Sequence, residues 1–397
     1  MKLAHRLDAI HESATLAVTD RAATLRRQGI DIVSLSAGEP DFDTPEHVKE
    51  AAVRALRDGF TKYTAVAGIS ELREAIAARL QRDYGLTYRP ADVVVTTGAK
   101  QAIFNLLHAL CDPGDEVLFF SPYWVSYPEM VRIVGAVPVA VTCSEAHDFR
   151  PDLDAFERAI TPRARVLLLN TPVNPTGACF TREDVVRIGE IARRHDLWII
   201  SDEIYDRLVY DGACHTSMPT VSEDAYRRTL LVNGMSKSYS MTGWRVGYAA
   251  GDAAAIAAAV KLQGQSTSNI TSISQKAALA ALTGDHSFFA GWVAEFDRRR
   301  RFLLERLRRI PGIRCATPRG AYYVFANVSA LFGKSAGNRP LRNDADLADA
   351  LLDQAHVAAV PGTAFGSSQH VRFSYATSIE NLGIAIDRME RWAATIH

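Results

Sequence analysis

Residues 197–205 read LWIISDEIY, and this stretch decides the fold class. Its apolar part, residues 197–200, contains no polar residue that alternates with the apolar ones. A strand with one face in water alternates apolar and polar side chains, so an unbroken apolar run predicts a strand that is buried on both faces. Such strands are typical of parallel sheets with helices on both sides.

Other runs of the same kind extend this prediction over the middle of the chain. They lie at 92–96, 116–120, 137–141, 165–170, 229–233 and 246–250. Helical patterns separate them, and in KQAIFNLLHALC (100–111) the apolar residues recur at the spacing of one helix face. The sequence therefore predicts an α/β fold: a large domain, residues 45–285, with a mostly parallel seven-stranded sheet covered by helices.

The two ends of the chain follow a different pattern. Residues 15–28 form a helix candidate, and a long amphipathic helical pattern follows residue 285. Strand-like segments then appear at 321–328 and 370–377. We expect a smaller α+β domain made of residues 1–44 and 286–397, with the N-terminal segment packed beside the C-terminal one.

Composition excludes several classes of partner. The 397 residues contain 45 Lys plus Arg and 45 Asp plus Glu, so the formal net charge is zero. This balance argues against nucleic acid, and the arginine run at 298–301 fits the solvated face of a helix. No apolar run reaches the length needed to cross a bilayer. The five scattered cysteines form no CxxC pair, so we expect neither a zinc site nor a disulfide framework, and a cytoplasmic location.

Polar residues follow several of the predicted strands, at the edge where open α/β sheets bind ligands. The glycine-rich motifs of nucleotide-binding loops and the GxSxG motif of serine hydrolases are absent. Taken one by one, the remaining segments also fit plain structural roles, namely a strand–helix turn at 96–100, a proline-braced turn around Asn174, a helix N-cap at Asp202 and a core aromatic at Trp124. Together with Lys237 and Arg245 they offer an anion cradle, a stacking ring, a carboxylate and an amine. This combination suits pyridoxal 5′-phosphate, whose aldehyde condenses with a lysine.

The chain resembles class I, fold-type-I pyridoxal-phosphate aminotransferases, and most closely their bacterial aspartate aminotransferase subgroup. The resemblance extends over nearly the whole chain. It rests on blocks that occur in the same order, namely SLSAGEPDFDTPEHV, KYTAVAGISELREAI, GAKQAIFN, DPGDEV, SPYWVSYPEMV, NTPVNPTGA, SDEIY, SKSYSMTGWRVGY and VRFSYATS.

This resemblance implies a role for each residue around the cofactor ring. Lys237 would bind the cofactor covalently and move protons, and Asp202 would pair with the pyridine nitrogen. Tyr205 and Asn174 would hydrogen-bond the phenolic oxygen, and Trp124 would stack on the ring. The cofactor phosphate would be bound by Ser236, Arg245 and the backbone N–H groups of Gly98, Ala99 and Lys100.

The same resemblance implies a dicarboxylic substrate and a shared dimeric site. Arg372 would bind the α-carboxylate with help from the N–H of Gly38, beside Trp124 and Asn174. Lys100 would favour the distal carboxylate of aspartate or glutamate. Tyr63 would reach the phosphate in the neighbouring subunit of a homodimer.

The expected reaction is a ping-pong transamination between an amino acid, most simply L-aspartate or L-glutamate, and a 2-oxo acid. Subgroup members usually carry Lys-Pro where this chain has His11-Glu12, which puts use of prephenate in doubt. Aromatic amino acids, prephenate or a specialised amino acid remain alternatives. A lyase of the same fold and a regulator that only binds the cofactor are more remote, and the regulator would need a DNA-binding module for which the motifs leave no room.

Overall fold

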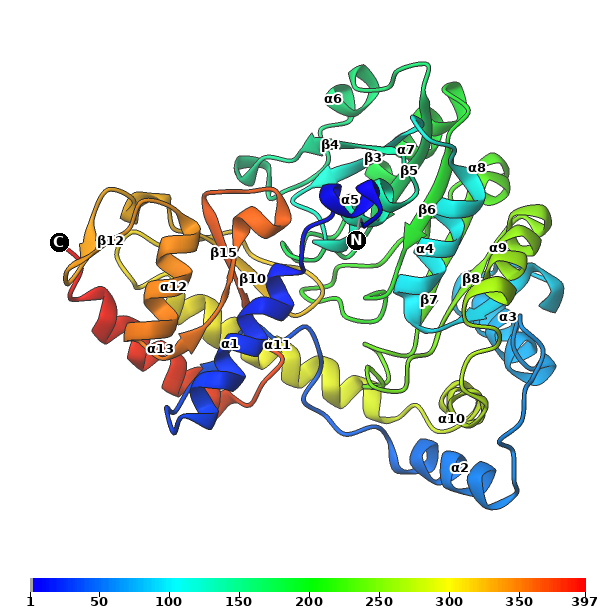
Figure 1. Cartoon of the computed structure of the whole chain (residues 1–397), viewed down its shortest axis with the longest axis horizontal. Coiled ribbons are helices and arrows are strands. Elements are labelled where there is room, and N and C mark those ends of the chain that lie inside the picture. The colour runs from blue at the N-terminus through cyan, green and yellow to red at the C-terminus, as the bar shows by residue number, and fades with distance from the viewer. Residues whose placement is uncertain (1–2) are drawn as a thin grey trace.

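The computed structural model describes residues 3–397 and has two parts, a larger one around a central sheet and a smaller one beside it (Figure 1). None of the helices within residues 3–397 could span a bilayer. In the same range no group of His, Cys, Asp and Glu side chains is arranged to hold a metal ion.

The larger part contains the predicted seven-stranded sheet. Its strands lie in the order β2-β8-β7-β6-β5-β3-β4, and all are parallel except β8, which is antiparallel to both neighbours. They are β2 (Val93–Thr96), β3 (Glu116–Ser121), β4 (Val137–Thr142), β5 (Ala164–Asn170), β6 (Trp198–Asp202), β7 (Thr229–Gly234) and β8 (Gly247–Ala250). This confirms the predicted α/β fold with a mostly parallel sheet.

One strand departs from the expected burial on both faces. β4 is largely exposed, and the side chain of Val137 is 44% exposed. β4 lies at the edge of the sheet and pairs only with β3, so its outer side has no further strand to cover it.

Helices cover both faces of the sheet, as the apolar runs predicted. On one face lie α4 (Gly98–Leu110), α5 (Ser126–Ile133) and α9 (Ala253–Ser266). On the other lie α6 (Leu153–Arg158), α7 (Arg182–Arg194) and α8 (Glu223–Arg228). Three more helices pack at the β2–β8 edge, α2 (Glu46–Arg57), α3 (Ser70–Tyr84) and α10 (Ser272–Thr283).

The smaller part is α+β, as predicted. Its antiparallel sheet has the order β14-β15-β10-β9, formed by β14 (Val360–Pro361), β15 (His370–Ser374), β10 (Tyr323–Asn327) and β9 (Arg314–Cys315). Helices α12 (Asp344–Gln354) and α13 (Ile379–Ala393) pack around it, and β11 (Ser335–Ala336) and β12 (Arg339–Pro340) form a hairpin.

The N-terminal segment belongs with this smaller part. Helix α1 (Ala14–Arg27) leads to β1 (Val33–Ser34), which pairs in parallel with β13 (Val357–Ala358). Residues more than 300 positions apart therefore share one sheet.

A single helix links the two parts. In α11 (Phe288–Leu307), Phe288 packs against the core beside α3 and α10, whereas Phe296 and Leu303 belong to the core of the smaller part. Figure 1 shows α11 running from beneath the small sheet towards α10. The division into residues 45–285 on one side and 1–44 with 286–397 on the other remains our proposal.

Candidate active site

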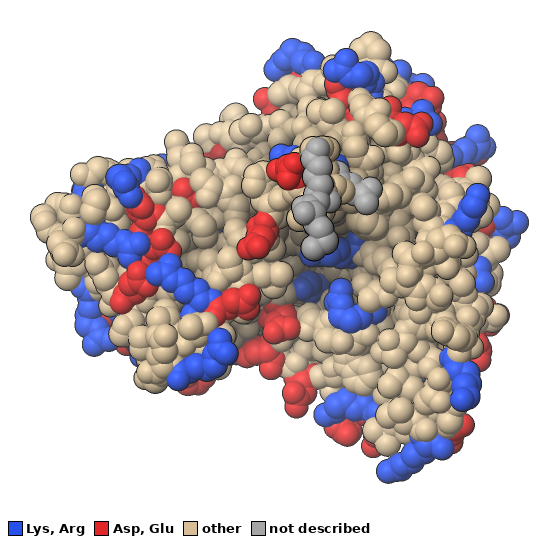
Figure 2. Space-filling model, viewed as in Figure 1, with Lys and Arg blue, Asp and Glu red and all other residues tan. Residues whose placement is uncertain are grey.

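A cavity of about 410 Å³ opens between the two parts, at the carboxyl ends of β5, β6 and β7. Figure 2 shows basic side chains in the hollow at the centre of that face. The cavity brings together most of the residues that the sequence singled out. Those that line it are Gly38, Ala99, Lys100, Trp124, Asn174, Asp202, Tyr205, Ser236, Lys237, Arg245 and Arg372.

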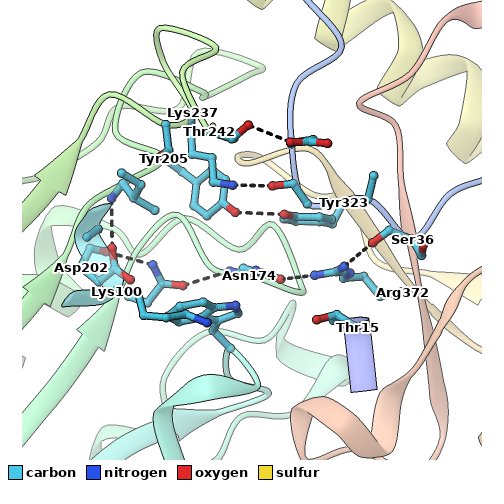
Figure 3. A pocket seen from close by; sticks show the side chains of 18 of the residues that line it. Thr15, Ser36, Lys100, Asn174, Asp202, Tyr205, Lys237, Thr242, Tyr323 and Arg372 are labelled. Carbon is cyan, nitrogen blue, oxygen red and sulfur yellow. Dashed lines mark hydrogen bonds between the residues drawn. The ribbon is translucent and has the colours of Figure 1, made fainter. Parts of the chain in front are cut away.

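Lys237 lies just after β7, and its side chain enters the cavity (Figure 3). Its ammonium group donates a hydrogen bond to the carbonyl oxygen of Gly38. Burial lowers the pKa of Lys237 to about 8, Arg372 and Arg245 add to this effect, and Glu39 opposes it. A lysine with this pKa has an appreciable neutral fraction near neutral pH, as a nucleophile or general base requires.

Asp202 is the last residue of β6 and is buried. Its Oδ2 accepts a hydrogen bond of 2.7 Å from the hydroxyl of Tyr127, and its Oδ1 accepts one of 3.3 Å from the N–H of Ile204. Burial raises the pKa of Asp202 to about 6, although these two donors oppose the rise. The interpretation of Asp202 as a helix N-cap is wrong, since a turn and no helix follows it. A buried carboxylate of this kind is stabilised by a cation placed against it.

The turn into α4 has the geometry of an anion cradle. The helix begins at Gly98, and the first N–H groups of a helix have no partner within it. Gly98 has φ +78°, and a Cβ there would lie 2.5 Å from Nη2 of Arg245. A Cβ on Gly247 would lie 2.3 Å from the nitrogen of Ala99. The absence of both side chains lets Arg245 and the helix N-terminus approach one point.

The guanidinium of Arg245 lies close to this cradle. Its Nη1 donates to the carbonyl oxygen of Thr242 at 2.8 Å and its Nη2 to that of Thr97 at 3.4 Å. Both partners are uncharged carbonyl groups, so the positive charge remains available to an anion. Ser236 lines the cavity beside it. Together these groups fit a phosphate bound by an arginine, a hydroxyl and a helix N-terminus.

Arg372, in β15, supplies a second cation deep in the cavity. It is 2% exposed, and its Nη groups donate to Oδ1 of Asn174 at 2.9 Å and to the carbonyl oxygen of Ser36 at 2.8 Å. Its Nε has no hydrogen-bond partner among the described residues. No carboxylate of residues 3–397 forms an ion pair with it, so this guanidinium is free to bind one from a ligand.

Asn174 and Tyr205 already have partners in this arrangement. The oxygen of Asn174 accepts from Arg372, which leaves its amide NH₂ group to donate into the cavity. The hydroxyl of Tyr205 lies 3.0 Å from that of Tyr323. Burial, and secondarily Tyr323, raises the pKa of Tyr205 well above its ordinary value, so Tyr205 is a hydrogen-bond donor at neutral pH.

Lys100 and Trp124 form another wall of the cavity. The ammonium nitrogen of Lys100 lies 4.8 Å from the centre of the Trp124 ring. Loss of hydration, and to a smaller extent Arg245, lowers the pKa of Lys100. The indole ring therefore borders the cavity as the sequence predicted, although its stacking on a cofactor ring remains a prediction.

Two predicted site residues, Tyr63 and Gly98, do not line this cavity, and neither does His11. Tyr63 is 91% exposed on the larger part, and Gly98 borders the site only through its contact with Arg245. The backbone N–H of His11 donates to Glu129 at 3.0 Å, and its Nδ1 lies 3.4 Å from the same carboxylate. His11 therefore contacts α5 and does not line the cavity.

Sequence reasoning missed several side chains that contribute to the site. Tyr127 lies three residues after Trp124, a spacing that places both near one another once a helix is assumed. Tyr323 and Glu39 carried no such signal, because a tyrosine in an apolar strand and a glutamate in a loop are ordinary. Thr15 and Thr19 also line the cavity, and only the packing of α1 beside the small sheet brings them there.

Comparison with known proteins agrees with this geometry. The model of the family "Aminotransferase class I and II" matches residues 30–389. An aspartate aminotransferase of Geobacillus stearothermophilus is 44% identical over 392 residues, covering 99% of both chains. An aspartate/prephenate aminotransferase of Thermus thermophilus is 48% identical, covering 98% of each.

Solved structures match equally well over their full length. The aspartate aminotransferase of Rhizobium meliloti superposes with a TM-score of 0.96 at 42% identity, covering 100% of both chains. That of Thermus thermophilus with maleate gives a TM-score of 0.92 at 47% identity, covering 99% of this chain and 100% of that one. This chain belongs to the class I and II aminotransferases, which are pyridoxal-phosphate-dependent enzymes.

Proposed function

We propose that this aminotransferase moves the amino group of a dicarboxylic amino acid, L-aspartate or L-glutamate, to a 2-oxo acid such as 2-oxoglutarate or oxaloacetate. One observation carries the proposal. The cavity contains a buried guanidinium, Arg372, without a carboxylate partner among the described residues, and a second cation, Lys100, that is free of ion pairs in the same range. Two such cations suit a substrate with two carboxylates.

When bound, pyridoxal phosphate supplies an aldehyde that condenses with amines and a ring that accepts the electron pair released at Cα. Ser236, Arg245 and the N–H groups of Gly98, Ala99 and Lys100 would bind its phosphate. Asp202 would hold a proton on the ring nitrogen, because a buried carboxylate stabilises the cation opposite it.

Lys237 would move the proton in the chemical step. Its neutral Nζ would remove the proton from the substrate Cα and later return it, so that Lys237 would act as general base and then as general acid. The lowered pKa near 8 makes the neutral amine available at modest cost near neutral pH. Arg372 would hold the α-carboxylate and so fix the substrate relative to Lys237 in the same cavity.

Tyr205 and Asn174 would donate to the phenolic oxygen of the cofactor, and Trp124 would cover one face of the ring. The same residues serve the second half of a ping-pong reaction, in which a 2-oxo acid takes up the amino group. Closure of the smaller part over the cavity would exclude water during both halves.

We also propose a cytoplasmic homodimer with shared active sites. Tyr63 supports the dimer, because a tyrosine that is 91% exposed on one chain has its ring available for burial against a second copy. A complementation assay tests this assembly. Chains with Lys237→Ala and chains with Tyr63→Ala, each inactive alone, should give activity when co-expressed, because one of the two sites in the mixed dimer is then intact. Absence of recovered activity would contradict the shared site.

Prephenate is the second candidate substrate, because relatives at 43% and 48% identity carry the name aspartate/prephenate aminotransferase. His11 argues against it here, since it contacts Glu129 and lies outside the cavity lining.

Single-turnover spectroscopy on the holoenzyme tests the function. Addition of aspartate or glutamate alone should convert the visible cofactor band to the ultraviolet band of the aminated cofactor. Phenylalanine, and the amino acid that forms when prephenate is aminated, should cause this conversion slowly. Lys237→Ala should abolish the conversion. Lys100→Ala should weaken the response to aspartate far more than the response to alanine. Equal rates with all amino acids would refute the dicarboxylate proposal.

A further inference from the structure

Tyr323 links the two ends of the cavity. It is the first residue of β10, is fully buried and lines the cavity. Its hydroxyl lies 3.0 Å from that of Tyr205, and its ring centre lies 4.3 Å from Cζ of Arg372. Figure 3 shows it between these two residues.

The ring of Tyr323 holds the Arg372 guanidinium in place without neutralising it. Arg372 also lies 4.8 Å from the ring centre of Phe365, so two aromatic rings flank the cation. Cation–π contacts stabilise a desolvated guanidinium while leaving its N–H donors free. A carboxylate partner in the same place would instead compete with a substrate carboxylate.

The hydroxyl of Tyr323 acts on the other end of the site. A phenol has one proton to donate, so when Tyr205 donates into the cavity, its oxygen can still accept from Tyr323. The Tyr322 hydroxyl also lies beside these two hydroxyls, but it donates its own proton to the carbonyl oxygen of Gly38 at 2.8 Å. When Tyr323 donates to the Tyr205 oxygen, it polarises the O–H bond of Tyr205. This strengthens the hydrogen bond that Tyr205 donates into the cavity.

We propose that Tyr323 is a positioning residue that couples recognition of the substrate α-carboxylate by Arg372 to the hydrogen bond that Tyr205 donates to the cofactor oxygen. This inference rests on the proposed function, because it assumes that Tyr205 faces that oxygen. It assigns the ring and the hydroxyl of Tyr323 to different tasks, which two substitutions can separate.

Tyr323→Phe removes the hydroxyl and retains the ring beneath Arg372. Weaker donation by Tyr205 stabilises the ionised cofactor oxygen less, so the pKa read from the pH titration of the visible band should rise by roughly 0.3 to 1 unit, the worth of one hydrogen bond. The value of kcat should fall, whereas KM for aspartate should stay within about twofold, since the cation–π contact is intact. Tyr323→Leu should in addition raise KM by roughly 2- to 30-fold.

Tyr375→Phe is the matched control. Tyr375 is a fully buried tyrosine whose hydroxyl donates at 3.2 Å to the carbonyl oxygen of Ala321, which also accepts from Tyr210 at 2.6 Å. The Tyr375→Phe variant loses an equally buried hydroxyl that contacts neither Tyr205 nor Arg372. The pKa of its visible band and its kinetic constants should therefore match those of the wild type.

The outcomes separate this inference from the proposed function. If the wild-type holoenzyme shows no visible band that depends on Lys237, the proposed function fails first. If the wild type reacts as expected but Tyr323→Phe titrates with the wild-type pKa, the coupling is wrong, whatever happens to stability. If Tyr323→Phe raises KM as much as Tyr323→Leu, the division between ring and hydroxyl is wrong.

Discussion

Replacement of Arg79 by methionine should destabilise the protein through the segment that carries the active-site turn. Arg79, on α3, is 1% exposed and donates to the carboxylate of Asp206 and, at 2.5 Å, to the hydroxyl of Tyr248. Asp206 also accepts from the hydroxyl of Tyr84 at 2.6 Å. Since Asp206 directly follows Tyr205, this buried ion pair ties α3 to the turn after β6.

The size of the effect follows from burial. Removing one partner of a buried pair costs about 3–5 kcal/mol, because the other charge stays in the interior without its nearest cation. An unfolding entropy of about 2.1 cal/mol/K per residue gives roughly 0.8 kcal/mol/K for the chain of 397 residues. The midpoint of thermal unfolding should therefore fall by about 4 to 6 °C. Differential scanning calorimetry of the holoenzyme at pH 7.5 measures it.

The pH dependence identifies the charge as the cause. Burial pushes the pKa of Asp206 up, but Arg79 and His215 outweigh it and hold the pKa below its ordinary value. In the wild type this carboxylate stabilises the fold above about pH 4 and loses that effect as the pH falls. In Arg79→Met the largest effect that opposes burial is lost, so the pKa of Asp206 rises and the deficit relative to wild type should shrink between pH 7.5 and pH 5.

Asp206→Asn in the Arg79→Met background is the control. It removes the carboxylate charge that Arg79→Met leaves without its partner. The thermal unfolding midpoint should therefore rise part of the way back at pH 7.5 and change little at pH 5. A loss below about 1 °C, or a deficit that is equal at both pH values, would refute the assignment of a buried ion pair to Arg79 and Asp206.

Three further outcomes follow from the site. Gly98→Ala should weaken cofactor binding by about tenfold or more, because its Cβ would displace Arg245 and a hydrogen bond to a charged group contributes about 1.5–3 kcal/mol. Equilibrium dialysis against pyridoxal phosphate measures this, and unchanged affinity would contradict the cradle. The rate at which the apoprotein captures the cofactor should rise from pH 7 and level off above about pH 8, where the Lys237 amine is neutral; a rate still rising at pH 10 would show an ordinary lysine. Tyr127→Phe removes a hydrogen-bond donor to Asp202, so the pKa of that carboxyl should rise further above 6. Loss of this donor should weaken cofactor binding by roughly tenfold, measured by the same dialysis.

The fold was predictable from sequence because its central strands have a strong local pattern. The seven apolar runs all became strands of one sheet, within one or two residues of their expected bounds, since burial on both faces leaves no room for polar residues. β4 was the exception, because a run such as VPVAV does not show whether its strand lies at an edge. The order of the strands and the antiparallel direction of β8 depend on contacts between distant segments, which no local pattern specifies.

The site was predictable to the extent that its residues follow strands. Asp202 ends a buried strand, Asn174 and Lys237 follow buried strands within four residues, and parallel strands bring their carboxyl ends to one edge. The family resemblance then supplied Arg372, which no strand-end argument would have chosen. Tyr323 and Tyr127 could not be found in either way, since their importance lies in hydrogen bonds to Tyr205 and Asp202, 118 and 75 positions away.

The net charge of the whole chain did not predict the charge of the active-site cavity. The chain is neutral overall, yet among the described residues the cavity is lined by the cations Lys100, Lys237, Arg245 and Arg372 and by the anions Asp202 and Glu39. Burial is the main cause of the lowered pKa values of Lys100 and Lys237, and repulsion between the like charges in this confined space adds to it. An anionic occupant relieves that repulsion, so the cavity favours a phosphate and carboxylates over neutral ligands of the same size. The surface charges elsewhere balance this excess, and for that reason composition alone could not locate it.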